Sequence, residues 1–269
     1  VALVTPLTGP DAAQGLASLR GLTLWARDEH VPLPWTDELA VVAEWAPLGV
    51  LTPWIAKEVP RHTVHVGAFR IGRYPVTNGE YLAFVLDDPT AERPSCWAHG
   101  VFPVGASNQP VYSLSPDGAD AYAAWLSRRT GRTFRLPTEA EWEYACRAGS
   151  KAAFSFGDDP KDIDQYGWYI DNSDEKSHKV GLKKPNPWGL YDMHGNVLEW
   201  CADAFDASEY AQYAGRVAED PRGPEGEAAN RVSRGGSATF LSFAYCRSAK
   251  RGWEKPDYRA ESQGFRVVA

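Results

Sequence analysis

The stretch NPWGLYDMHGNVLEWCAD, residues 186–203, carries two acidic side chains around a turn. Asp192 and Glu199 offer hard oxygen ligands, and Gly195 between them allows a tight backbone turn. Calcium binds carboxylates together with backbone carbonyls, so the pattern fits a calcium site. It equally fits a turn that Asp192, Asn196 and Glu199 hold by hydrogen bonds to the backbone. The residues alone leave both interpretations open.

Three helices are predicted on the N-terminal side of this stretch. Each begins after a hydroxyl side chain that can cap it, at Thr77, Ser115 and Thr138. The first and third also have a glutamate three residues later, which completes a capping box. Gly131 ends the second helix and Gly149 the third. The third helix lies in RLPTEAEWEYACRAG, residues 135–149.

The rest of the chain indicates short strands and long loops. Residues 62–78, HTVHVGAFRIGRYPVTN, alternate apolar and polar side chains as strands do. From Ser150 onward, turn-rich segments such as DNSDEKS and DPRGPEG leave room only for short strands. Residues 1–60 are rich in Ala, Leu, Pro and Trp, and we expect an N-terminal extension packed on a main domain of residues 61–269.

Composition excludes several classes of function. The net charge of -7 argues against nucleic-acid binding, which requires a basic face. No apolar run of about 18 residues predicts a membrane span, so we expect a soluble protein of undetermined compartment. Four scattered cysteines suit neither a disulfide scaffold nor a thiolate zinc site. The chain begins at Val1, and we expect that the native N-terminus is missing.

Four ordered phrases carry a family resemblance. They are residues 71–84 (IGRYPVTNGEYLAF), 135–149, 186–203, and the series RVSRGGS, CRSAKR and GFRVV within 231–268. Together they resemble the formylglycine-generating-enzyme, or sulfatase-modifying-factor, family over roughly residues 60–269. The resemblance implies an α+β, C-type lectin-like fold with few helices, short strands and long irregular loops. Because the family contains several activities, the fold does not decide the function.

The metal sites of the family transfer only in part. Its enzymes hold copper with two cysteines just after the GGS phrase, but here ATFLSFAY follows and Cys246 matches another position. We therefore expect Cys246 to be a small buried apolar residue. Related sulfoxide synthases hold iron with histidines of a further domain, and His62 and His65 have no evident third partner. The family's calcium site implies Asp192 and Glu199 with the carbonyls of Gly195 and Val197, so structural calcium is a candidate although no cofactor is required.

The closing stretch, about residues 234–268, resembles variable proteins of diversity-generating retroelements, which use the same domain. Fixed-looking phrases alternate with gaps at residues 238–245, 250, 252–255, 258 and 260–263. The resemblance implies that the phrases, with arginines 234, 247, 251, 259 and 266, form a scaffold, while the gap side chains form an exposed ligand-binding face. The predicted ligand-binding residues are Thr239, Phe240, Leu241, Phe243, Tyr245, Lys250, Trp253, Glu254, Lys255, Tyr258, Glu261 and Gln263. The alternative is that several of the aromatic ones are ordinary core residues.

These observations predict a non-enzymatic protein that binds a protein or other macromolecular ligand. The alternative is an oxygen-dependent enzyme of the formylglycine-generating or sulfoxide-synthase type. A third hypothesis is an accessory domain of a larger enzyme. The missing cysteine pair and histidine triad favour the first, so we expect that the chain is not an enzyme.

Overall fold

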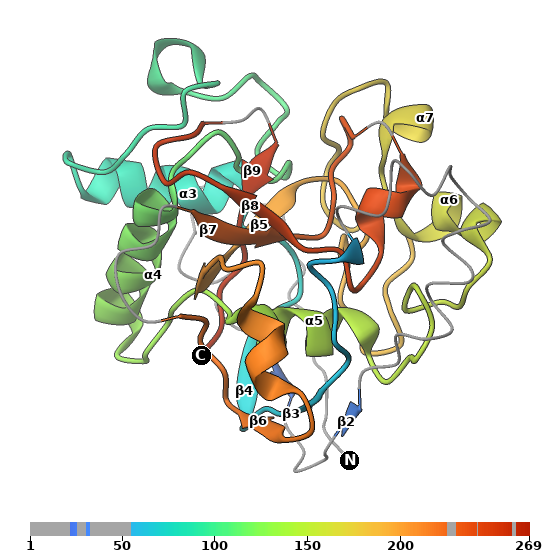
Figure 1. Cartoon of the computed structure of the whole chain (residues 1–269). Coiled ribbons are helices and arrows are strands. Elements are labelled where there is room, and N and C mark those ends of the chain that lie inside the picture. The colour runs from blue at the N-terminus through green and yellow to red at the C-terminus, as the bar shows by residue number, and fades with distance from the viewer. Residues whose placement is uncertain (1–21, 26–30, 33–54, 225–229, 241, 260–261) are drawn as a thin grey trace.

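The computed structural model describes residues 22–25, 31–32, 55–224, 230–240, 242–259 and 262–269 (Figure 1). Strands in these ranges form three small sheets, ordered β1-β4, β2-β3-β6 and β8-β7-β5-β9. The first two use β1 (Leu22–Trp25), β2 (Val31–Pro32), β3 (Thr63–His65), β4 (Phe69–Gly72) and β6 (Val217–Glu219). The third uses β5 (Leu198–Ala204), β7 (Arg231–Arg234), β8 (Gly252–Glu254) and β9 (Gln263–Gly264).

The three longer helices begin where the sequence predicts. Helix α3 (Asn78–Asp87) and helix α5 (Glu139–Arg147) both have complete capping boxes, and the Ser115 hydroxyl caps α4 (Pro116–Thr130). Gly131 ends α4 in a left-handed conformation, φ 69°. Helix α5 ends at Arg147 and is followed by two left-handed residues, the C-cap Ala148 (φ 48°) and the predicted Gly149 (φ 86°).

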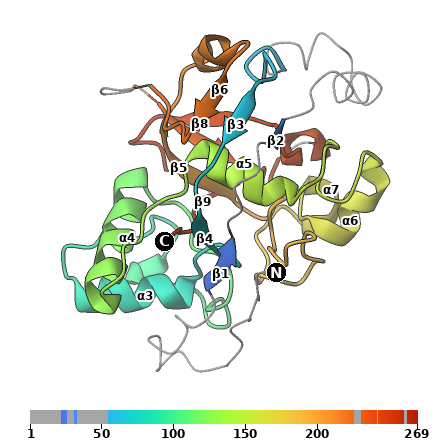
Figure 2. The same ribbon diagram turned by 90° about the horizontal axis from the view of Figure 1, so that it is seen from below.

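Short helices occupy the loop-rich parts. They are the α-helices α6 (Ile163–Tyr166) and α7 (Ile170–Ser173) and the 3-10 helices η2 (Ala98–Gly100), η3 (Pro160–Asp162), η4 (Glu209–Tyr213) and η5 (Phe243–Cys246). Figure 1 shows α3 and α4 to one side of the four-stranded sheet and α6 and α7 to the other. Figure 2 shows α5 between these two groups, with β3 and β6 beyond it. The expected α+β class with few helices and short strands is confirmed.

The closing stretch is built into the four-stranded sheet. Strand β7 pairs antiparallel with both β5 and β8, and β9 runs parallel to β5. Phe265, which follows β9, is fully buried and makes edge contacts with the rings of Tyr81 and Tyr122. Helix α5 packs on β5 and β7, and its fully buried Trp142 donates a hydrogen bond to Glu199 (2.7 Å). The last residues of the chain therefore belong to the core.

The predicted extension is described only in part. Within residues 1–60, β1 pairs with β4 and β2 pairs with β3, while residues 1–21, 26–30 and 33–54 lie outside the described residues. The boundary at residue 60 stays a prediction. None of the helices in the described part of the chain is both long and apolar enough to cross a membrane.

Candidate functional site

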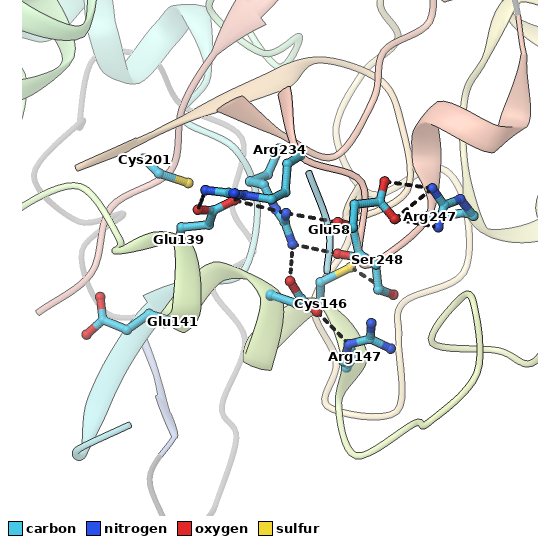
Figure 3. A network of polar contacts seen from close by, with 12 residues as sticks. Glu58, Glu139, Glu141, Cys146, Arg147, Cys201, Arg234, Arg247 and Ser248 are labelled. Carbon is cyan, nitrogen blue, oxygen red and sulfur yellow. Dashed lines mark hydrogen bonds and ion pairs between the residues drawn. The ribbon is translucent and has the colours of Figure 1, made fainter. Parts of the chain in front are cut away.

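Four arginines of the closing stretch form a buried frame. Arg234, Arg247, Arg251 and Arg266 are each at most 2% exposed. Arg234 lies at the centre of the network in Figure 3, where its guanidinium donates to Glu139 Oε1 (3.1 Å) and to Glu143 of α5. Arg147 donates to the other oxygen of Glu143. Buried charges are tolerated only when they are paired in this way, so the frame depends on these pairs.

The other three arginines are also paired with carboxylates, and Arg251 shares Glu139 with Arg234. Arg247 pairs with the buried Glu58, as Figure 3 shows, and Arg251 forms two hydrogen bonds of 2.8 Å to Glu139. Arg266 holds both oxygens of Glu199. The predicted scaffold role is thus supported at these positions. Arg259 differs, because its side chain is partly exposed and pairs with Glu92 near the surface.

Both carboxylates of the predicted calcium site already accept hydrogen bonds. Glu199 accepts hydrogen bonds from Trp142 and from Nε and Nη2 of Arg266. The Asp192 carboxylate accepts from the Gly181 amide (2.8 Å) and the Asn196 side chain (3.2 Å). A cation would therefore compete with an arginine for Glu199. The carbonyls of Gly195 and Val197 lie in the same turn, and calcium binding through these four residues stays a prediction.

One group of gap residues surrounds η5. The rings of Phe240 and Tyr245 meet edge to face, with centroids 4.9 Å apart, and Phe243 contacts Tyr169 just before α7. Thr239, Phe240, Phe243 and Tyr245 are all partly exposed. Each of these rings thus contacts another aromatic ring and is only partly accessible to solvent.

A second group follows along β8. Trp253 is partly exposed, stacks on Phe205 at 4.4 Å, and has the Lys57 ammonium 3.4 Å from its ring centroid. Glu254 is also partly exposed, and Lys255 is exposed. Tyr258 is 48% exposed. We call these residues, together with those around η5, the gap surface: Thr239, Phe240, Phe243, Tyr245, Trp253, Glu254, Lys255 and Tyr258.

Two predicted face residues are buried instead. Gln263 is fully buried, because β9 pairs with β5 inside the sheet. Lys250 is 8% exposed, and its ammonium donates to the Arg251 carbonyl (2.6 Å) beside the Tyr245 ring. The expectation that these two side chains face solvent is wrong. Leu241 and Glu261 lie outside the described residues.

Three of the four cysteines are buried thiols. Cys146, Cys201 and Cys246 are buried, and Cys96 is exposed. Burial raises the pKa of Cys146 to about 12 and also raises the pKa values of Cys201 and Cys246, so these thiols stay protonated near neutral pH. Copper binding through these side chains would require the loss of their protons. Within the described ranges, no group of three or more His, Cys, Asp or Glu side chains is arranged to hold a metal ion.

The histidines serve separate contacts. His65 pairs with Glu219 at 2.7 Å, while the His62 ring packs against Tyr210 and Tyr213. His194, which the sequence did not single out, donates from Nδ1 to the Cys246 carbonyl (2.9 Å) and accepts from the Ser155 hydroxyl at Nε2 (2.7 Å). Burial lowers the pKa of His194 to about 4, so the ring is neutral at pH 7. It ties the turn at residue 194 to the end of η5.

Comparison with known proteins identifies the family. The model of the sulfatase-modifying factor enzyme 1-like domain matches residues 41–269. The chain belongs to this family. A formylglycine-generating enzyme from Thermomonospora curvata is 33% identical, with 79% of this chain and 85% of the relative covered. The mouse formylglycine-generating enzyme is 29% identical, with 94% and 79% covered.

Two solved structures share the fold of this sulfatase-modifying-factor domain. Treponema denticola variable protein 1 superposes with a TM-score of 0.71 at 27% identity, covering 92% of this chain and 95% of that one. PvdO from Pseudomonas aeruginosa gives the same TM-score at 28% identity, covering 92% and 93%. The C-type lectin-like, formylglycine-generating-enzyme type of fold is confirmed.

The comparisons also correct one expectation. The curated relatives are enzymes, which contradicts the expectation that the chain is not one. That expectation relied on two missing ligand sets, and the absence of particular ligands does not exclude catalysis by other residues of the same fold.

Proposed function

We propose that this domain binds a protein ligand through the gap surface. The proposal rests on the contrast between buried and exposed side chains within the closing stretch. The frame arginines are buried and ion-paired, whereas the side chains of the gap surface are partly or largely exposed. A rigid frame lets exposed residues change without loss of the fold, as in antibody loops.

The chemistry of the gap surface supports a protein ligand. Its aromatic residues are Phe240, Phe243, Tyr245, Trp253 and Tyr258. Such side chains dominate the contact energy of protein interfaces because they bury large areas with few rotatable bonds. The similarity to a variable protein from Treponema denticola supports the idea that this surface is diversified.

A surface-display experiment tests the capacity to bind. One library randomises Thr239, Phe240, Phe243, Trp253, Glu254, Lys255 and Tyr258. A matched library randomises seven buried positions of the same stretch, including the four frame arginines and Phe265. We expect most members of the first library to resist protease and to yield binders to hen egg lysozyme, because exposed substitutions change stability by less than about 0.5 kcal/mol. Equal loss of protease resistance in both libraries would contradict the proposal.

The sequence similarity favours a second candidate, oxidation of a peptide cysteine by O2. To test this activity, the full chain is incubated with a cysteine peptide, copper and a reductant. Any aldehyde formed from the peptide cysteine is then captured with a hydroxylamine reagent. Because Cys146 and Cys246 are buried and protonated, aldehyde formation that survives Cys246→Ser would identify an enzyme with a different metal site. Aldehyde formation lost in that variant would show that the buried thiol becomes a ligand.

A further inference from the structure

A pocket away from the gap surface lies between β3, α5 and η4. Its empty volume is about 550 Å³, which includes the open solvent at its mouth. The side chains of Val64, Val66 and Tyr144 contribute to its wall. Figure 2 shows β3 lying beyond α5. The rings of His62, Tyr210 and Tyr213 complete an aromatic side.

Four carboxylates line this pocket, and two of them already have cationic partners. Glu139 is held by Arg234 and Arg251, and Glu143 is held by Arg234 and Arg147. Arg251 also lies over the Tyr210 ring at 4.0 Å, and its remaining donors reach backbone carbonyls. The arginines beside the pocket are therefore already bound to Glu139, Glu143 and backbone carbonyls.

The other two carboxylates, Asp203 and Glu209, have no ion pair with any described residue. Asp203 is 3% exposed, and its Oδ2 accepts one hydrogen bond, from the Glu139 amide (2.8 Å). Glu209 is 7% exposed and accepts from the Tyr213 hydroxyl (2.6 Å). A buried carboxylate that lacks an ion pair is costly to ionise, so a cation bound in the pocket would stabilise its charged form.

We propose that this pocket binds a primary alkylammonium group, with Asp203 and Glu209 accepting its hydrogen bonds and the aromatic rings packing on its alkyl chain. A guanidinium prefers two free oxygens of one carboxylate, and Oδ2 of Asp203 is already used. A quaternary ammonium has no N–H to donate. An ammonium is a compact charge with three donors, and aromatic faces attract it further.

The titration of Asp203 gives a second readout. Burial, together with the charge of Glu139, raises the pKa of Asp203 to about 8. The charged and titratable groups near Asp203 also include Arg135, Glu141, Arg251 and Tyr213. His62, Glu143, Glu209 and Tyr210 share the pocket. An ammonium favours the ionised carboxylate and thus displaces a proton below that pH. Affinity should therefore rise as the pH approaches 8.

Calorimetry on the full chain tests the proposal with n-butylamine and Nα-acetyl-lysine methylamide as probes. Tetramethylammonium and Nα-acetyl-norleucine methylamide are the matched controls, because one lacks N–H donors and the other lacks the charge. We expect one amine per chain and no binding of either control. Tighter binding of the lysine amide than of butylamine would indicate a peptide source, and equal binding a free amine.

Two variants decide the outcome. Asp203→Asn removes the charge and should weaken amine binding at least about tenfold. Ala140→Leu adds bulk at a partly exposed helix position that lines the pocket and should block binding while leaving the helix intact. Absence of millimolar amine binding in the wild type, or binding unchanged in Ala140→Leu and in folded Asp203→Asn, would overturn the proposal.

Discussion

Arg234→Ala is expected to lower the free energy of unfolding by about 3–5 kcal/mol. The guanidinium is fully buried and is shared between Glu139 and Glu143, so its removal leaves two buried carboxylates short of a partner. It also donates to the carbonyls of Ser248 and Ala249, which hold the CRSA phrase in place. Urea denaturation of the wild type and the variant measures the difference.

Arg259→Ala is the matched control within the same stretch. Its pair with Glu92 is partly exposed, and such pairs contribute about 0–1 kcal/mol. If Arg234→Ala were no more destabilising than Arg259→Ala, the buried frame would not hold the fold.

At acidic pH, the loss of unfolding free energy caused by Arg234→Ala should become smaller. Burial alone would raise the pKa of Glu143. The charges of Arg234 and Arg147 outweigh burial and lower this pKa overall, so the ion pairs stabilise the fold at neutral pH and lose this contribution as the pH falls.

Phe265→Ala is expected to cost about 3–5 kcal/mol, because it empties a fully buried ring site. The ring meets Tyr81 of α3 and Tyr122 of α4, so one residue of the closing stretch joins two helices to the sheet. Tyr258→Ala, at a 48% exposed aromatic of the same stretch, should cost less than about 0.5 kcal/mol. A similar fall in Tm for the two variants would show that phrase residues are not more important for folding than gap residues.

Local signals account for the part of the fold that sequence predicts well. The capping boxes at Thr77 and Thr138 involve residues three apart, so their hydrogen bonds depend on little else. The frame arginines could be predicted as a group from the phrases that contain them. Their partners could not, because Arg247 reaches Glu58 across most of the chain.

Burial of single gap residues depends on tertiary structure and was predicted less well. Gln263 and Tyr258 both fall in gaps, but the pairing of β9 with β5 buries only Gln263. The pocket around Asp203 shows the same limit. Its two unpaired carboxylates come from β5 and η4, and no sequence spacing indicates that both face β3 and α5.

The most direct test of the central claim is the thermal melting of a variant with Trp253, Glu254, Lys255 and Tyr258 all replaced by Ala. These side chains are exposed or partly exposed, and Trp253 contributes mainly its stack on Phe205 and its contact with Lys57. We predict one cooperative transition with a Tm lowered by less than about 6 °C, since an aromatic stack contributes about 0.5–1.5 kcal/mol beyond its area burial. Loss of the cooperative transition, or a fall as large as that of Phe265→Ala, would show that these residues are core and would contradict the account.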